Sequence, residues 1–172
     1  MNVKSAIQSR RSIRKYKDKP VPDKLINEII NSARLAPSGN NIQPSKYLII
    51  KDEKTKKELK DNKVIRDGWE YKAPVIIVCC TNPEAYTKRD KNWDEENKIR
   101  AIRDLSIASS YLMLQATELK LGTCYVGWID KEKIKEVLKI PKHYIVPYII
   151  TLGYPDESPG PRPRKEMNEI IL

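Results

Sequence analysis

The chain is built around the stretch QSRRSIRKY at residues 8–16, in which three arginines, a serine and a lysine crowd into six consecutive positions. It follows residues 2–9, whose apolar spacing is helical, and it precedes Pro20 and Pro22, which must leave that helix. Arginine is the side chain suited to a phosphate, because its planar fork gives paired, charge-assisted hydrogen bonds. The stretch is therefore either an anion-binding element or a solvated basic turn, and its own residues leave both open.

Two further stretches favour the anion-binding interpretation over the solvated turn. Residues 36–44, APSGNNIQP, follow a clear helix and precede a clear strand, with two prolines, one glycine, four amide or hydroxyl side chains and no charge. Such a loop is rich in neutral donors and acceptors, which suits a heterocycle edge or ribityl hydroxyls, although an ordinary helix-to-strand connection is the alternative. Residues 160–165, GPRPRK, form another compact cation cluster.

The three stretches, in this order and at these distances, resemble the FMN-dependent nitroreductase family. The resemblance runs over nearly the whole chain and includes three further segments at residues 73–78, 104–121 and 122–128. Each motif is short and made of common residues, so the specificity of the match comes from their collinearity.

The resemblance implies an α+β fold with a central, mostly antiparallel sheet flanked by helices, assembled as a homodimer with a C-terminal strand exchanged between subunits. It implies two FMN sites at the interface, with the loop contributed by the other subunit, the two basic clusters on the phosphate and pyrimidine edge, and residues 125–127 over one flavin face. The implied cofactor-binding residues are Arg10, Arg11, Ser12, Arg14, Pro37, Ser38, Gly39, Asn41, Gln43, Tyr125, Val126, Gly127, Arg162 and Arg164. No catalytic side chain and no metal ligand is expected, because the flavin carries the redox chemistry.

The activity implied by the resemblance is that of an NAD(P)H-dependent flavin oxidoreductase. A hydride passes from NAD(P)H to flavin N5, and a small acceptor such as a nitroaromatic or a quinone then takes two electrons at the same place, in a ping-pong cycle. Two alternatives stay open: a relative with other flavin chemistry, such as reductive dehalogenation or flavin fragmentation, and a non-enzymatic FMN carrier. The chain departs from the family pattern at Ser45, where many relatives carry Trp, and at residues 85–98, which replace a longer lid.

Length, charge and composition exclude several other classes of protein. At 172 residues we expect a single domain spanning residues 1–172. The net charge of +10 comes from scattered lysines interleaved with acids, without a recognition helix, so no nucleic-acid partner is expected. The apolar runs are too short for a membrane span or a signal peptide, and three cysteines do not make a disulfide framework, so we expect a cytoplasmic protein. A lone histidine, His143, argues against a zinc site or a catalytic triad, and no Gly-x-Gly-x-x-Gly supports a Rossmann site.

The apolar pattern predicts the elements. Helices are expected at residues 2–9, 22–36, 53–61, 99–121 and 131–138. Strands are expected at residues 46–50, 74–80, 123–126 and 144–152, with a trailing strand at 167–172.

Four details of these elements are open to test. Residues 46–50 read as a buried strand and 74–80 as a central one, whereas Pro147 demotes its strand to an edge or a bulge. Gly122 is placed to cap the helix at 99–121, which is apolar on two sides and so belongs in the core centre or at a subunit interface. Residues 68–72 stay unassigned, and residues 85–98 are a lid, a short helix or a mobile loop.

Overall fold

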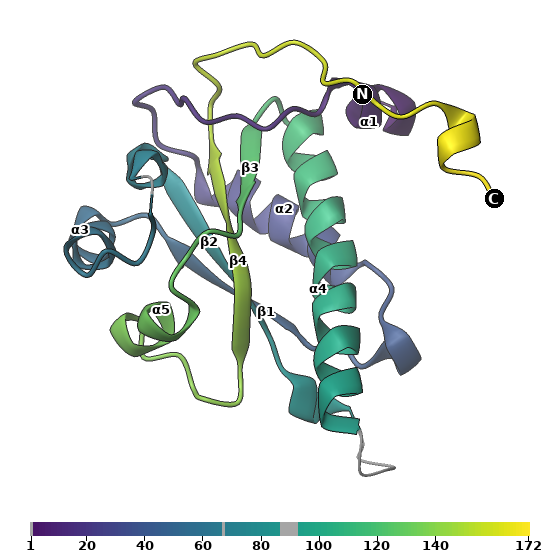
Figure 1. Cartoon of the computed structure of the whole chain (residues 1–172). Helices are drawn as coiled ribbons and strands as arrows, with labels where there is room; N and C mark the ends of the chain where they lie inside the picture. Colours follow the sequence, from purple (N-terminus) through teal and green to yellow (C-terminus); the bar gives the residue numbers. More distant parts are fainter. Residues whose placement is uncertain (1, 67, 87–92) are drawn as a thin grey trace.

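The computed structural model of the chain describes residues 2–66, 68–86 and 93–172 (Figure 1). Four antiparallel strands form one sheet in the order β1-β2-β4-β3. The strands are β1 (Ser45–Ile50), β2 (Val75–Thr81), β3 (Gly122–Val126) and β4 (Ile145–Gly153). The α-helices are α1 (Val3–Ser9), α2 (Asp23–Arg34), α3 (Glu53–Asp61), α4 (Trp93–Glu118) and α5 (Lys131–Val137). Short 3-10 helices are η1 (Gly39–Asn41), η2 (Trp69–Lys72), η3 (Pro83–Ala85) and η4 (Met167–Glu169). The α+β class and the antiparallel sheet flanked by helices are therefore confirmed.

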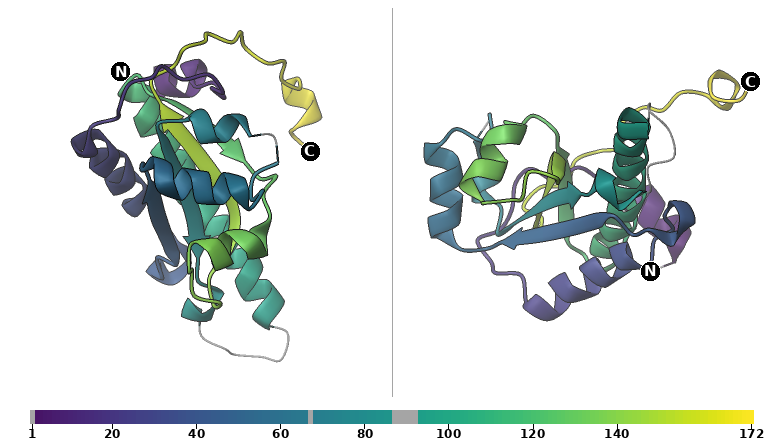
Figure 2. Two further views of the ribbon diagram at one scale, coloured as in Figure 1. Left: turned by 90° about the vertical axis from the view of Figure 1, so that its left-hand side faces the viewer. Right: turned by 90° about the horizontal axis from the view of Figure 1, so that it is seen from below.

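Strand β2 divides the core into two layers. All seven of its residues are buried, as expected of a central strand, and successive side chains point to opposite faces. Val75, Ile77 and Cys79 pack in the cluster under α2 and α4. Ile76, Val78 and Cys80 pack on the other face, in the cluster under α3 and α5. The helices on the two sides of the sheet are visible in Figure 2. Cys79 and Cys80 are therefore buried free thiols on opposite faces of the sheet.

Helix α4 is the long helix expected from the apolar pattern, but its end is made differently from the prediction. The left-handed residue is Lys120, with φ of 60°, and the backbone N–H of Leu121 donates to the carbonyl of Ala116 at 2.8 Å. This is the Schellman arrangement, in which a residue after the helix adopts φ > 0. The prediction that Gly122 caps the helix is wrong, because Gly122 is the first residue of β3.

One strand prediction is wrong, and another is decided in favour of one of its two alternatives. The segment expected to be a buried strand, β1, is half-exposed with Lys46 and Leu48 outward, because it is an edge strand that pairs only with β2. Pro147 does not lie in an edge strand, since β4 is paired on both sides. Instead the register shifts between Cys79 and Thr81 opposite this part of β4, so the bulge alternative is confirmed.

The C-terminal segment is not the strand expected from its apolar pattern. Residues 167–169 form η4, closed by a hydrogen bond of 2.9 Å from the backbone N–H of Glu166 to the Glu169 carboxylate. No described strand lies beside it, and the segment projects from the body of the chain (Figure 2). Residues 69–72, left unassigned, form η2. Of the segment 85–98, η3 ends at residue 85, α4 begins at residue 93, and residues 87–92 lie outside the described part. None of the described helices has the length and apolarity needed to span a bilayer.

Two glycines let the N-terminal basic stretch lie against the sheet. Gly122 and Gly153 are direct partners in the β3–β4 pairing. A Cβ on Gly122 would lie 2.7 Å from Ile13 Cγ1, and a Cβ on Gly153 would lie 2.6 Å from Pro74 Cδ and 2.8 Å from Tyr16 Cδ1. Hydrogen bonds fix the contact: the Ile13 N–H donates to the Thr123 carbonyl at 2.9 Å, and the Tyr16 hydroxyl pairs with the Thr151 hydroxyl at 2.7 Å.

We predict that Gly153→Ala destabilises the fold by about 1–3 kcal/mol, since the new methyl group has no room beside Tyr16 and Pro74. Urea unfolding of the variant and the wild type measures the difference. Gly160→Ala is the matched control, because nothing lies within 4 Å of its Cβ position and the smaller entropy of unfolded alanine leaves it neutral or slightly stabilising. A Gly153→Ala variant as stable as the control would contradict the packing argument.

Candidate functional site

The two basic clusters of the sequence, residues 8–16 and 160–165, meet in one cavity of about 340 Å³, here called the cation pocket. Its lining comprises Ile7, Gln8, Arg10, Arg11, Ser12, Arg14, Pro159, Gly160, Pro161, Arg162 and Arg164. Five of these residues are arginines and none is acidic. Six of the expected cofactor-binding residues therefore lie together, although they come from opposite ends of the chain.

The segment that follows β4 is held against the basic stretch by backbone hydrogen bonds. The Lys17 N–H donates to the Tyr154 carbonyl at 2.9 Å, and the Asp156 N–H donates to the Lys15 carbonyl at 3.0 Å. The Glu157 carboxylate accepts from the backbone N–H groups of Arg14 and of Lys15, the latter at 3.1 Å. Glu157 thus orders the stretch through its backbone and does not line the pocket.

The arginines of the cation pocket differ in what they bind. The Arg11 guanidinium donates to the carbonyls of Gln8 at 2.7 Å and Arg10 at 2.9 Å, which closes the end of α1. The Arg164 guanidinium donates to two carbonyls of its own segment, at 2.9 and 3.2 Å. No hydrogen bond or ion pair to the described residues engages the guanidiniums of Arg10, Arg14 and Arg162. These three are the cations available to an anionic ligand.

The polar loop forms a second, separate cavity of about 370 Å³, the loop pocket. Pro37, Ser38 and Gln43 line it, whereas Gly39 and Asn41 belong to the same loop but not to its lining. The loop is tightly bent, because its residues 40, 41 and 43 all have positive φ of 51°, 55° and 53°. The Gln43 N–H donates to the Ser38 hydroxyl at 2.9 Å, which closes the bend.

The third group of expected residues lies at the end of β3. Tyr125 is 38% exposed, and its ring contacts Tyr148 edge-on with centroids 4.8 Å apart. Neither Tyr125 nor Val126 nor Gly127 lines the cation pocket or the loop pocket. A single chain therefore does not bring the three groups of expected residues into one cavity.

Asp104 is a site residue that the sequence reasoning missed. Its side chain, only 2% exposed, lines the loop pocket, and its carboxylate accepts from the Gly39 N–H at 2.7 Å, the Tyr86 hydroxyl and Arg103 Nε at 3.0 Å. Burial acts to raise the pKa of this carboxyl, but the hydrogen bonds from Tyr86, Gly39 and Arg103 outweigh it and hold the pKa below its usual value. The signal in the sequence was an acid on the buried face of α4, next to Leu105 and one turn from Ala101 and Ala108.

The cysteine beside the cation pocket is not set up as a nucleophile. Burial raises the pKa of the Cys124 thiol, although Arg14 and Ser12 act in the opposite direction. The thiol therefore stays protonated near neutral pH, whereas a reactive cysteine needs the thiolate. Among the described residues, no group of three or more His, Cys, Asp or Glu side chains is placed to hold a metal ion.

Comparison with known proteins gives the family. The family model described as "Nitroreductase family" matches residues 7–64 and 60–154. A protein of Methanothermobacter thermautotrophicus, named as a candidate NADH dehydrogenase/NAD(P)H nitroreductase, is 34% identical over all of this chain and 87% of its own length. The chain belongs to the nitroreductase family.

Two other relatives extend the comparison within the nitroreductase family. An "FMN reductase [NAD(P)H]" of Bacillus subtilis is 27% identical over 94% of this chain and 69% of its own length. A candidate nitroreductase of Exiguobacterium sibiricum, solved in complex with FMN, superposes with a TM-score of 0.89 over 100% of this chain and 97% of its own, at 21% identity. At that identity the superposition shows the nitroreductase fold alone.

For this nitroreductase-family chain we predict that Asp104→Asn loosens the loop and costs about 1.5–3 kcal/mol at neutral pH, because a charged acceptor for three donors is lost. The folded-state pKa of Asp104 is lowered, so its stabilisation is complete above the ordinary pKa of about 4 and is lost as the pH falls through the lower folded-state pKa.

Unfolding of wild type and variant between about pH 3 and about pH 7 checks this pH dependence, and the two stabilities should converge at the acid end. Asp61→Asn serves as the control, because Asp61 makes an exposed ion pair with Lys57, which contributes about 0–1 kcal/mol. A difference between wild type and Asp104→Asn that does not change with pH would argue against the carboxylate as the anchor.

Proposed function

We propose that this chain is an FMN-dependent oxidoreductase that takes reducing equivalents from NADH or NADPH and passes them to a small acceptor such as a nitroaromatic or a quinone. The observation that carries the proposal is the cation pocket, in which three guanidiniums are available and no described lining residue is acidic. The names of the relatives from Methanothermobacter and Bacillus support NADH or NADPH as the reductant, and the name of the Bacillus relative also supports FMN as the cofactor.

The residues of the cation pocket fit the phosphate end of FMN. A phosphomonoester carries about two negative charges near neutral pH, and arginine binds it through paired hydrogen bonds. Arg10, Arg14 and Arg162 supply the charge, and Ser12 adds a neutral donor. Thr123, which forms a β-bridge with Ser12, has a buried hydroxyl without a hydrogen-bond partner among the described residues, although Thr123 itself does not line the cation pocket. We propose that Arg10 and Arg162 bind the phosphate and that Arg14 faces the pyrimidine edge.

The bound flavin would supply hydride acceptance and donation. The chain supplies orientation and a fixed positive potential, and no side-chain nucleophile or general base is needed for that work. Cys124, the one thiol beside the cation pocket, is held protonated by burial and stays out of the chemistry. The loop at residues 37–43, anchored by Asp104, would contribute its polar groups to a site completed by a second subunit.

We propose that residues 1–172 act as one domain within a homodimer, with the C-terminal segment exchanged between subunits. The chain leaves apolar side chains exposed at Val3, Leu35 and Tyr111, which line one groove between α1, α2 and α4. Four more are exposed in the projecting C-terminal segment, namely Met167, Ile170, Ile171 and Leu172. A second copy that covers these surfaces would also bring the loop of one chain to the cation pocket of the other. The three buried cysteines without a disulfide support a cytoplasmic location.

The visible spectrum of the purified protein tests the proposed function. A flavin spectrum that NADH or NADPH bleaches anaerobically, and that a quinone or a nitroaromatic restores, is the expected result. A yellow protein that neither nucleotide bleaches would favour an FMN carrier. Release of FAD, or no flavin bound after reconstitution with excess FMN, would overturn the proposal.

We predict that Arg10→Ala weakens FMN binding by about tenfold to a hundredfold, because it removes a charged partner of the phosphate. Its effect on the midpoint potential should be small, since the phosphate keeps its charge on reduction. Arg14→Ala should lower the potential, because it removes the cation assigned to the pyrimidine edge. FMN titration and a redox titration measure both quantities, with Lys4→Ala as the control for a cation of α1 that does not line the pocket.

We predict a dimeric mass by light scattering at micromolar concentration, and a monomeric mass for a variant that ends at residue 165. Obligate interfaces commonly bury more than about 2,000 Å², and removal of residues 166–172 takes away four exposed apolar side chains. Circular dichroism shows whether the shortened chain stays folded. A monomeric wild type would refute the homodimer, and a dimeric shortened chain would refute the role of the C-terminal segment.

A further inference from the structure

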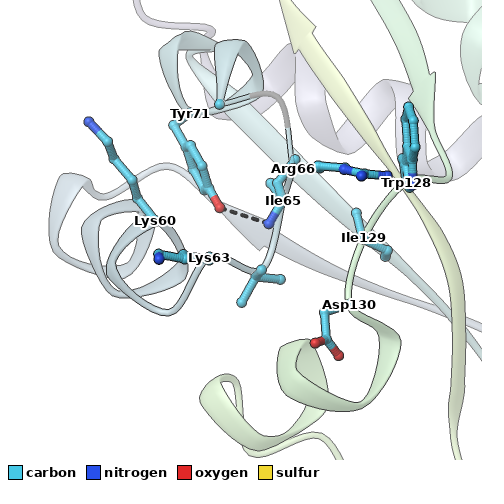
Figure 3. A pocket seen from close by; sticks show the side chains of 10 residues that line it. Lys60, Lys63, Ile65, Arg66, Tyr71, Trp128, Ile129 and Asp130 are labelled. Carbon is cyan, nitrogen blue, oxygen red and sulfur yellow. Dashed lines mark hydrogen bonds between the residues drawn. The ribbon is translucent and has the colours of Figure 1, made fainter.

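A third cavity, of about 590 Å³, lies between the segment after α3 and the segment that joins β3 to α5 (Figure 3). We call it the Trp128 pocket. The side chains that matter to the argument are Lys60, Lys63, Arg66, Tyr71, Trp128 and Asp130. It shares no lining residue with the cation pocket or the loop pocket.

Hydrogen bonds tie the two walls of the Trp128 pocket together. Ile65 and Ile129 form a β-bridge, and the Asp130 N–H donates to the Val64 carbonyl at 2.8 Å. The Tyr71 hydroxyl accepts from the Ile65 N–H at 2.9 Å and donates to the Leu59 carbonyl at 3.1 Å. The bridge and the Asp130–Val64 bond join segments far apart in the sequence, and the Tyr71 bonds brace the first wall, so the cavity is built before any ligand arrives.

The charge of the pocket is positive. Lys60, Lys63 and Arg66 line it, and within the described part of the chain none of the three has an acidic partner. Asp130, the acid among the described lining residues, is engaged elsewhere: its carboxylate accepts from the Lys133 N–H at 2.9 Å at the start of α5 and pairs with the Lys133 ammonium at 3.9 Å. An anionic ligand would therefore meet three cations that have no acidic partner among the described residues.

Trp128 gives the pocket a stacking surface. Its side chain is 63% exposed, although tryptophan is usually highly buried. The Arg66 guanidinium lies over the indole, 4.2 Å from the ring centroid, as Figure 3 shows. A guanidinium held on an indole presents a flat surface with a positive charge, which suits a planar ring that carries an anionic group.

We infer that the Trp128 pocket binds the adenosine-phosphate end of the nicotinamide nucleotide. The adenine would stack at Trp128, and the phosphate would bind Arg66 and Lys63. The inference rests on the proposed function, in which NADH or NADPH is the reductant. Trp128 directly follows Gly127, the last residue of the segment assigned to the flavin face, so the pocket adjoins in the chain the segment beside which the flavin is proposed to bind. The cavity, of about 590 Å³, is large for a single-ring acceptor.

Calorimetric titration of the FMN-saturated protein with AMP tests the inference, with adenosine as the uncharged comparison. FMN saturation keeps the phosphate of AMP out of the cation pocket. We expect AMP to bind about tenfold more tightly than adenosine, and Lys63→Gln and Arg66→Gln each to weaken AMP by about tenfold, the usual effect of losing one charged partner. Lys54→Gln, which removes one positive charge from α3 at a position that does not line the pocket, should leave AMP binding unchanged.

Each contrary result has a distinct meaning. Equal binding of AMP and adenosine, absence of AMP binding, or an equal loss in Lys54→Gln and Lys63→Gln would overturn the inference. If para-nitrobenzoate displaces AMP at a concentration below that of AMP, the inference is wrong, and the pocket binds an anionic acceptor instead. The proposed function is tested separately, by FMN binding and anaerobic bleaching. If FMN binding and bleaching fail, but AMP binding is weakened by Lys63→Gln and not by Arg10→Ala, the oxidoreductase assignment is wrong and the AMP site stands.

Discussion

The architecture depends on one contact, between the N-terminal basic stretch and two glycines that face each other across β3 and β4. Because Gly122 and Gly153 are paired, the sheet has a bare patch at this end, on which Ile13 and Tyr16 rest with no room for another methyl group. The contact fixes the course of the backbone through Arg10 and Arg14, and the chain leaving β4 then runs alongside. Two basic clusters from opposite ends of the sequence meet for this reason, and the cation pocket exists because they do.

Gathering five guanidiniums is electrostatically unfavourable, and the structure offsets the repulsion locally. Arg11 and Arg164 donate to carbonyls of their own segments, and the Glu157 carboxylate accepts from the backbone of the stretch it steadies. The remaining cations face a solvent-exposed cavity, where water screens them until an anion replaces it. Some arginines therefore stabilise the structure of the site, and the others are available to bind an anion.

Asp104 fixes the position of the polar loop, as the glycine pair fixes the position of the basic stretch. A loop with three non-glycine residues at positive φ does not hold its shape by propensity alone, and a buried carboxylate on α4 supplies the anchor at Gly39. The loop pocket and the cation pocket remain separate in one chain, which is the arrangement expected if each half of a site waits for a second copy. Trp128 and Arg66 add a third anchored surface, so every candidate binding region rests on a contact between distant segments.

The sequence by itself determined the elements, since periodicity, caps and prolines act over a few residues. The β-branched run of β2, the Asp130 cap of α5 and the polar loop were all predictable, and so was the collinear pattern that gave the family. It did not determine where a strand lies in the sheet. β1 is half-exposed and β4 is internal because of strand pairings that the apolar pattern of the sequence does not encode. It missed Asp104, the Arg11 cap and the pairing of Gly122 with Gly153, and it predicted a strand over the last residues, of which 167–169 form the 3-10 helix η4. Those features were decided by the tertiary structure, because burial, charge pairing and steric room are set by residues distant in the chain.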